Sequence, residues 1–394
     1  MIKLTDEKRK EIINIYESSY FGNGYTNLKR YIEYESDSIE LLYGILKNDE
    51  LCAVHIVADG DFRIRNRKFS GYYLSYAAVL PQFRGAGYGR QLLKDTINMA
   101  DEQGKVLLEM DPFQHSFYEG FGFSTAFDNY YLSIPQELIH TFKIRITNQL
   151  EGGFLNNSIK YMEEYILLKK YFFERSAYND NYLNKIYWKS RMYDSFQFYY
   201  INDFDEKGYI LYKIQDDNLS VYEMKYNNKK VFILLVSFIT LYKNYVKTIS
   251  FEAVPLDFYK EIMIKDFWNS GQKVCFEYYP IRMLRILNLE YIAKQLIKCH
   301  LINNEFSLYI EDKILERNNK VFVFNSDGVY AREKSEKSNG KIDIKDFTQL
   351  ITGHMTAENL YYQNKLVLFD NDMYILKMLD GCFPPQITFS PDPM

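Results

Sequence analysis

The chain has 394 residues, 47% hydrophobic and 25% charged, which is ordinary for a globular protein of two or three domains. Its net charge of −4 argues against nucleic acid as the main partner. The longest apolar stretch, 231–242, is too short to span a bilayer, and the N-terminus lacks the apolar core of a secretory signal, so no membrane partner is expected.

The cysteines and histidines predict neither disulfides nor a metal site. The four cysteines lie far apart without a closely spaced pair, which is typical of reduced, buried thiols in a cytoplasmic protein. The five histidines have no ligand-like spacing. We therefore expect a cytoplasmic protein without bound metal.

The pattern predicts an α+β domain over residues 1–135. Residues 5–20 have the spacing of a helix, and residues 39–80 alternate as strands. Turn signals within these strands occur at Asn48-Asp49 and at Asp59-Gly60. A glycine-rich loop then leads into a helix, and the domain closes with a short strand, a helical turn and a last strand.

Residues 136–280 predict a second unit with a similar order of elements. A long helix at 158–175 precedes a strand pair at 208–226, and a helix and the strand at 248–254 follow. The strand–helix–strand order repeats that of the first unit, but no glycine-rich loop is present. The second unit is therefore interpreted as a duplicated copy without activity.

Residues 281–394 predict a third, α/β domain. Strands at 305–312 and 320–325 enclose a turn, and the segment 343–354 reads as a helix that opens on an Asp cap. The end of the chain, 382–394, contains four prolines and cannot form regular structure. Such a tail is either free in solvent or bound in a groove.

Residues 82–87, QFRGAG, are the most informative segment of the chain. A dinucleotide-binding fingerprint would need a third glycine where Arg90 stands, and a Walker loop would need Gly-Lys-Ser or Gly-Lys-Thr. The segment fits a third template, Gln/Arg-x-x-Gly-x-Gly/Ala at the start of a helix. The alternative is a glycine-rich turn that only begins a helix.

The physical argument favours phosphate binding at this loop. Backbone N–H groups in the first turn of a helix lack partners, and the helix dipole adds positive potential there. Gly85 and Gly87 allow close approach of a pyrophosphate, and Arg84 and Arg90 add charge.

A second motif identifies the loop. In FYEGFGF, at 117–123, Tyr118, Gly122 and Phe123 occupy the places of a Tyr-x-x-x-Gly-Phe motif. The two motifs together resemble the GNAT N-acetyltransferases, whose acyl-CoA signature is the Gln/Arg-x-x-Gly-x-Gly/Ala loop. The resemblance implies acetyl-CoA as cosubstrate and a primary amine as acceptor.

The whole chain resembles the Eis (enhanced intracellular survival) type of this superfamily. Residues 283–286, MLRI, are similar to the start of the sterol-carrier-protein-like third domain of that family. The resemblance implies two tandem GNAT-like domains at 1–135 and 136–280, a sterol-carrier-protein-like domain at 281–394, and a hexamer. It also implies broad specificity for aminoglycosides, polyamines or lysine-like amines.

The resemblance assigns roles to particular residues. Backbone N–H groups around Ala78 and Val79, at the end of the strand, would hold the acetyl carbonyl and the pantetheine arm, and residues 84–90 would hold the pyrophosphate. Tyr118 would protonate the leaving thiolate, whereas the alternative for Tyr118 is an ordinary core aromatic. The predicted acyl-CoA-binding residues are Ala77, Ala78, Val79, Arg84, Gly85, Ala86, Gly87, Tyr88, Gly89 and Arg90.

The general base is the least defined role. Eis-type enzymes use the terminal carboxylate, which here would be that of Met394, although family tails usually end in an aromatic residue. An α-carboxyl has an ordinary pKa of about 3.5 and needs burial to become a good proton acceptor. Asp392, Glu109 or water are the alternatives.

The chain as a whole is predicted to be an acetyl-CoA-dependent N-acetyltransferase. Because the third domain resembles sterol carriers and the loop would bind CoA in either case, the alternative is a non-catalytic acyl-CoA- or lipid-binding protein. A regulatory interaction protein is a third reading.

Overall fold

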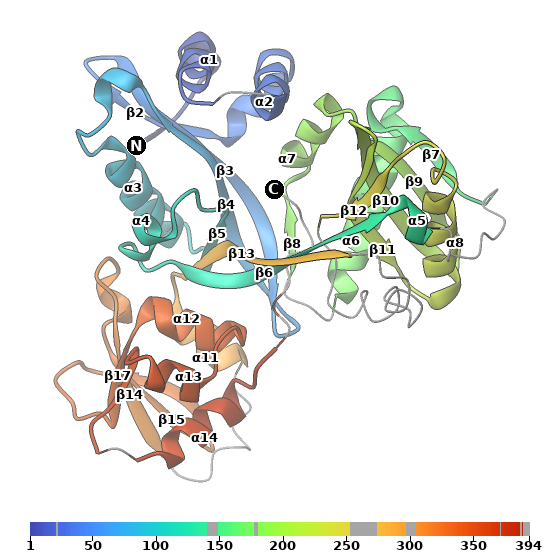
Figure 1. The fold of residues 1–394 in the computed structure, drawn as a ribbon. Coiled ribbons are helices and arrows are strands. Elements are labelled where there is room, and N and C mark those ends of the chain that lie inside the picture. Colours follow the sequence, from blue (N-terminus) through green and yellow to red (C-terminus); the bar gives the residue numbers. More distant parts are fainter. Residues whose placement is uncertain are drawn as a thin grey trace. The chain divides into compact units, whose positions relative to one another are not determined.

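Figure 1 shows the computed structural model, which describes residues 1–20, 23–139, 149–176, 180–252, 274–296, 305–370, 372–386 and 388. The chain forms two compact units. Unit 1 contains Met1–Phe127, Ala177–Asn184 and Ile281–Thr388, and unit 2 contains Asp128–Ser176, Lys185–Pro280 and Phe389–Met394. No helix among the described residues is long and apolar enough to cross a membrane.

The N-terminal part of unit 1 is a mixed sheet with the strand order β1-β2-β3-β4-β5-β13. The strands are β1 (Ile2–Lys3), β2 (Leu42–Lys47), β3 (Glu50–Ile64), β4 (Arg67–Val79), β5 (Leu107–Met110) and β13 (Cys275–Ile286). The helices are α1 (Arg9–Glu17), α2 (Asn23–Tyr34), α3 (Tyr88–Glu102) and α4 (His115–Glu119). The predicted first helix and the α+β class are thus confirmed.

Helices α3 and α4 pack on one face of this sheet (Figure 1). Leu93 and Ile97 of α3, Leu74 of β4, Leu108 of β5 and Tyr118 of α4 belong to one cluster of buried side chains. The spacing of Leu93 and Ile97 puts both on the same side of α3, which explains why the helix covers the sheet there. This cluster places the glycine-rich loop and α4 on the same part of the fold.

One predicted turn is wrong. Strand β3 passes through Asp59-Gly60 without interruption, and the hairpin turns at Arg65 and Asn66, whose φ angles are 50° and 63°. Strand β8 (Asp180–Leu183) pairs with β3 at this place. A Cβ on Gly60 would lie 2.8 Å from Leu183 Cδ2, so the glycine permits close approach of β8 rather than a turn.

The C-terminal part of unit 1 has five described strands in the order β16-β15-β14-β17-β18, with β14 and β17 parallel. These are β14 (Phe306–Glu311), β15 (Val321–Asn325), β16 (Gly328–Arg332), β17 (Gly340–Asp343) and β18 (Leu366–Leu368). The helices are α11 (Leu289–Leu296), α12 (Ile344–Thr352), α13 (Ala357–Tyr362) and α14 (Tyr374–Cys382). As predicted, Asp343 caps α12, with its carboxylate accepting from the Lys345 N–H at 3.0 Å.

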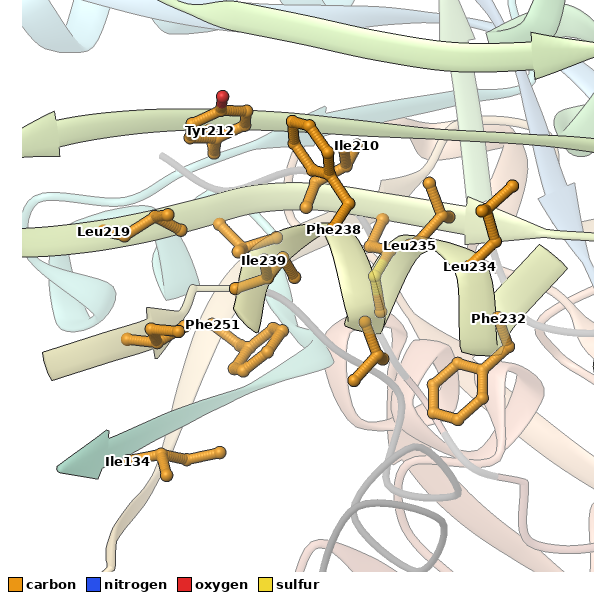
Figure 2. Close-up of a cluster of buried hydrophobic side chains, with 14 of the residues drawn as sticks. Ile134, Ile210, Tyr212, Leu219, Phe232, Leu234, Leu235, Phe238, Ile239 and Phe251 are labelled. Atoms are coloured by element: carbon orange, nitrogen blue, oxygen red, sulfur yellow. The ribbon is translucent and has the colours of Figure 1, made fainter. Parts of the chain in front are cut away.

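In unit 2, the strands have the order β6-β12-β11-β10-β9-β7. Its strands are β6 (Ser124–Pro135, which begins in unit 1), β7 (Glu151–Phe154), β9 (Gln197–Asn202), β10 (Lys207–Gln215), β11 (Asn218–Tyr226) and β12 (Thr248–Phe251). The helices are α5 (Gln136–Ile139), α6 (Ile159–Arg175), α7 (Lys185–Lys189) and α8 (Lys229–Thr240). Figure 2 shows that Leu235, Phe238 and Ile239 of α8 pack onto the sheet.

The two units repeat one supersecondary arrangement. In unit 1, β3 and β4 form an antiparallel hairpin, α3 follows, and β5 returns parallel to β4. In unit 2, the hairpin β10–β11, helix α8 and the parallel strand β12 do the same. This internal repeat agrees with the tandem arrangement predicted from the order of elements.

Candidate acyl-CoA and catalytic site

The end of strand β4 has an open edge in unit 1. Parallel pairing between β4 and β5 ends at Leu74 and Met110, whereas β4 continues to Val79. Leu80 donates its N–H to the Cys52 carbonyl of β3 at 2.9 Å, so strand alternation directs the N–H of Val79 away from β3. The backbone of Val79 can therefore bond a ligand at this edge.

A β-bulge in β4 lies directly before this end. Ser75 pairs with Ile56 and Ala78 pairs with Val54, so Tyr76 and Ala77 together oppose one residue of β3. Tyr76 has φ 50°, in the left-handed region. Ala78 pairs with Val54 and lies two residues before Leu80, so its N–H is directed to β3 as that of Leu80 is. The predicted donor role of Ala78 is therefore wrong, and the outward N–H groups are those of Ala77 and Val79.

The glycine-rich loop leaves the start of α3 uncovered. Gly85 and Gly87 have φ angles of 79° and 90°, and a Cβ on either would meet nothing within 4 Å. Gly87 is the N-cap of α3 and supplies no side-chain hydrogen bond to the first turn. The space beside both glycines at the start of α3 is thus open, and no side chain caps the first turn, which suits a pyrophosphate.

The two arginines of the loop have different surroundings. Arg84 donates from Nε to the Val79 carbonyl at 3.0 Å, and from Nη2 to the Ser18 carbonyl and to Ser19 Oγ, both at 3.1 Å. Arg90 lies 5.4 Å above the ring of Phe117 in α4. Arg84 therefore ties the loop to the strand end and to the segment after α1, and Arg90 brings a positive charge beside α4.

The corresponding helix of unit 2 differs at its start. Asn228 caps α8, and its side-chain oxygen accepts from the Val231 N–H at 3.0 Å. One of the first-turn donors that would bind phosphate is thereby satisfied within the protein. The repeat in unit 2 retains the fold but lacks the uncovered helix start.

Substituting Gly87 by alanine should raise the KM for acetyl-CoA about tenfold, because a Cβ would occupy the space in front of the α3 amides. Gly104 offers a matched control at the other end of α3, since it also has a positive φ of 72° and no atom near a Cβ. Gly104→Ala introduces similar backbone strain, yet its KM should stay at the wild-type value. Steady-state kinetics of both variants test the assignment, which equal KM values would refute.

Tyr118 lies at the end of α4, only 5% exposed. The rings of Phe113, Phe117 and Phe123 surround it at centroid distances of 5.0 to 6.2 Å. Burial raises the pKa of Tyr118 well above its ordinary value of 10, and the neighbouring Tyr20 raises the pKa further. The phenol is therefore protonated at neutral pH. Because the raised pKa makes it a weaker acid, it can protonate a thiolate only in a transfer concerted with cleavage of the carbon–sulfur bond.

The predicted alternative base, Glu109, is enclosed in an ionic network. Its Oε1 accepts from Arg282 Nη1 at 2.9 Å and from Asn181 Nδ2 at 2.8 Å. Arg282 also donates from Nε to Asp111 Oδ1 at 2.9 Å, and Asp111 accepts from the hydroxyl of Tyr73. Glu109 is thus held inside the fold by bonds to a single oxygen. The other predicted bases, Asp392 and Met394, lie outside the described residues.

Glu109 should make stability depend on pH. Burial raises the pKa of Glu109 from 4.5 to about 7, although Arg282 lowers the pKa in part. The folded state then favours the protonated carboxyl. The resulting contribution to the free energy of unfolding is complete below pH 4.5 and is lost as the pH rises through 7. The unfolding free energy of wild type relative to Glu109→Gln should fall by on the order of 2 kcal/mol between pH 5 and pH 8. Urea denaturation measures it, and a constant difference would contradict the expectation.

The Tyr-x-x-x-Gly-Phe motif and the segment 283–286 are in contact. A Cβ on Gly122, which has φ 80°, would lie 1.7 Å from Nη1 of Arg285 in β13. Arg285 is fully buried, and its Nη2 bonds both carboxylate oxygens of Asp312 at 2.8 and 2.9 Å. The segments around 122 and 285 therefore form one structural element behind α4. Nothing in the sequence indicated the pairing with Asp312.

Sequence reasoning also missed Tyr20. Its hydroxyl donates to the Ala77 carbonyl at the bulge, at 2.8 Å. The residue follows α1 at a distance of 57 positions from Ala77 and belongs to no motif. As one of 37 tyrosines it carried no signal in the sequence.

Comparison with known proteins gives two domain matches. Residues 1–126 match the family model of the acetyltransferase (GNAT) domain, and residues 291–391 match that of the sterol carrier protein domain. No curated protein matches the chain in sequence.

Solved structures share the fold over 100% of this chain. They include a GCN5-related N-acetyltransferase from Anabaena variabilis, with a TM-score of 0.79, 17% identity and 99% of its own chain covered. A probable N-acyltransferase from Enterococcus faecalis has a TM-score of 0.82, 18% identity and 98% coverage. Eis1 from Mycobacterium abscessus has a TM-score of 0.77, 14% identity and 99% coverage. These structures confirm the fold, and the two domain matches agree with the resemblance that the motifs indicated.

Proposed function

The chain contains a GNAT acetyltransferase domain and a sterol carrier protein domain, and from this premise we propose that it transfers the acetyl group of acetyl-CoA to a primary amine. The observation that carries the proposal is the open end of β4 followed directly by the uncovered start of α3. A thioester carbonyl at the strand and a pyrophosphate at the helix start match these two sets of N–H groups. The acceptor would be an aminoglycoside, a polyamine or a lysine-like amine.

The reaction is direct attack within a ternary complex. The neutral amine forms a bond to the carbonyl carbon while the carbon–sulfur bond breaks. Of the outward N–H groups of Ala77 and Val79, one stabilises the negative charge that develops on the carbonyl oxygen and the other binds the pantetheine arm. The thiolate of CoA takes a proton from the phenol of Tyr118, and the attacking nitrogen gives up a proton to a base.

The terminal carboxylate of Met394 is our proposal for that base. Thr388 is the last residue that the structure describes, and it is 3% exposed. The chain is therefore still buried at this residue. Prolines in the tail lower the entropy cost of fixing an extended segment.

Adding five residues after Met394 should therefore reduce kcat about tenfold or more, because the carboxylate would move away from the amine. An N-terminal extension is the wrong control here, since the Met1 ammonium bonds Asp95 at 2.9 Å. A C-terminal amide on Met394, made by ligation, removes the charge without adding length and should have a similar effect. Full activity of both forms would exclude the carboxylate.

The proposed function is tested by release of free thiol from acetyl-CoA in the presence of polyamines and aminoglycosides. Release that depends on the amine, with acetylated amine found by mass spectrometry, supports it. Binding of acetyl-CoA without thiol release would instead favour a non-catalytic acyl-CoA- or lipid-binding protein, which the sterol carrier domain makes the second candidate.

The organisation of the protein in solution is also a proposal. We expect three domains at 1–135, 136–280 and 281–394, a hexamer, and a cytoplasmic location. Limited proteolysis, light scattering and cell fractionation measure these in turn.

A further inference from the structure

Tyr20 contacts the part of β4 where the thioester would bind. Its hydroxyl donates to the Ala77 carbonyl at 2.8 Å, and its ring packs edge-on against that of Tyr76 at 5.8 Å between centroids. The two contacts lie on neighbouring residues of the same bulge. Tyr20 thus holds this short backbone segment both by its ring and by its hydroxyl.

The bulge needs such support. Tyr76 has φ 50°, and a side chain with a Cβ is unfavourable in the left-handed region. A backbone conformation of this kind persists where surrounding contacts hold it, and it is common at functional sites. Tyr20 supplies one contact to the ring of Tyr76 and one to the next carbonyl.

The hydrogen bond to the Ala77 carbonyl also affects the orientation of the peptide that follows Ala77. The peptide that joins Ala77 to Ala78 carries this carbonyl on one side and the Ala78 N–H, directed to Val54, on the other. Hydrogen bonds on both sides fix the plane of this peptide, and bonds in such a chain strengthen one another. The orientation of the outward N–H groups of Ala77 and Val79 follows from that plane.

We propose that Tyr20 is a positioning residue for acetyl transfer, whose hydroxyl fixes the Ala77 peptide so that an adjacent outward N–H group points at the thioester carbonyl. This inference rests on the proposed function.

Tyr16, in the last turn of α1 and four residues before Tyr20, provides a matched control. It is fully buried, its ring lies 6.0 Å from that of Tyr20, and its hydroxyl has no hydrogen-bond partner among the described residues. Tyr16→Phe removes a hydroxyl from the same tyrosine cluster without touching the bulge. We expect this variant to keep wild-type kinetics and thermal stability.

Tyr20→Phe keeps the ring and removes only the bond to Ala77. It should lower kcat about tenfold and leave the KM for the amine within twofold. Isothermal titration calorimetry with acetyl-CoA and with CoA gives a second readout, because CoA has no acetyl carbonyl. The preference for acetyl-CoA over CoA should fall several-fold in Tyr20→Phe, with CoA affinity unchanged. Replacement of Tyr20 by 4-aminophenylalanine, which retains a donor at the para position, should restore most of the activity.

The outcomes separate the two proposals. If wild type acetylates no amine, the proposed function fails, and the calorimetric ratio still decides whether Tyr20 orients the bound carbonyl. If wild type is active and Tyr20→Phe matches it in kcat and in the ratio, the role of Tyr20 is overturned. Equal loss of acetyl-CoA and CoA affinity, or unfolding of Tyr20→Phe at the assay temperature, would also overturn it, since either indicates a purely structural role.

Discussion

Tyr118→Phe is expected to lower kcat about 100-fold while the dissociation constant of acetyl-CoA changes less than threefold. A positioned general acid typically contributes a factor of 10² to 10⁴, and phenylalanine preserves the ring that packs against Phe117 and Phe123. Since burial raises the pKa of Tyr118, its proton remains available at alkaline pH. The wild-type rate should therefore show no alkaline decline caused by Tyr118 below about pH 10.

A suitable control removes another hydroxyl from the same core. Tyr72 of β4 belongs to the cluster that contains Tyr118, and its hydroxyl bonds Gln103. Tyr72→Phe should keep kcat within about twofold, because this hydroxyl is directed to the C-terminal end of α3. Stopped-flow or steady-state assays of the two variants, with acetyl-CoA binding measured by calorimetry, provide the comparison. Unchanged turnover in Tyr118→Phe would remove the phenol from the mechanism.

Arg285→Met should lower the free energy of unfolding by about 3 to 5 kcal/mol, the largest change in stability that we expect from one substitution. Both side chains of the Arg285–Asp312 pair are 0% exposed, so methionine would leave the Asp312 carboxylate buried without its countercharge. Asn318 Nδ2, at 2.9 Å from Asp312 Oδ2, is an uncharged donor and compensates only in part. Urea denaturation and amide hydrogen exchange across β13 and β14 measure the loss.

The matched control is an arginine at the surface of the same part of unit 1. Arg332 lies 3.4 Å from Glu305, with the two side chains 36% and 48% exposed. Arg332→Met should change stability by less than about 1 kcal/mol, because water already screens this pair. Equal losses of unfolding free energy in the two variants would mean that the buried Arg285–Asp312 pair stabilises the fold no more than the exposed pair does.

Arg285 also connects stability with the candidate site. The space above Gly122 is filled by its guanidinium, and Gly122 closes the turn that follows α4. We expect Arg285→Met to loosen the support behind Tyr118 and to reduce kcat as well as stability. The sterol carrier part of unit 1 thereby contributes to the geometry of the acetyltransferase part through a buried ion pair.

The local sequence determined the elements and the chemistry of the loop. Helical spacing identified α1, α3 and α6, and the Asp343 cap identified the start of α12. The sequence predicted an anion site at Gly85 and Gly87, where no side chain caps the helix. This prediction was possible because a helix start and glycines with positive φ depend on a few neighbouring residues. The Tyr-x-x-x-Gly-Phe motif indicated Tyr118 in the same way.

The tertiary structure alone decided which distant residues meet. Gly60 was predicted to form a turn, but it permits close approach of β8. Glu109 was a candidate base, but its carboxylate accepts hydrogen bonds from Arg282 and Asn181. The hydroxyl of Tyr20 donates to the carbonyl of Ala77, 57 positions away in the chain. Strand pairing and buried ion pairs join segments far apart in the chain, and a single sequence has no periodicity that records them. The residues of the glycine loop are thus determined locally, whereas the direction of the N–H groups beside it depends on the packing of α1 against β4.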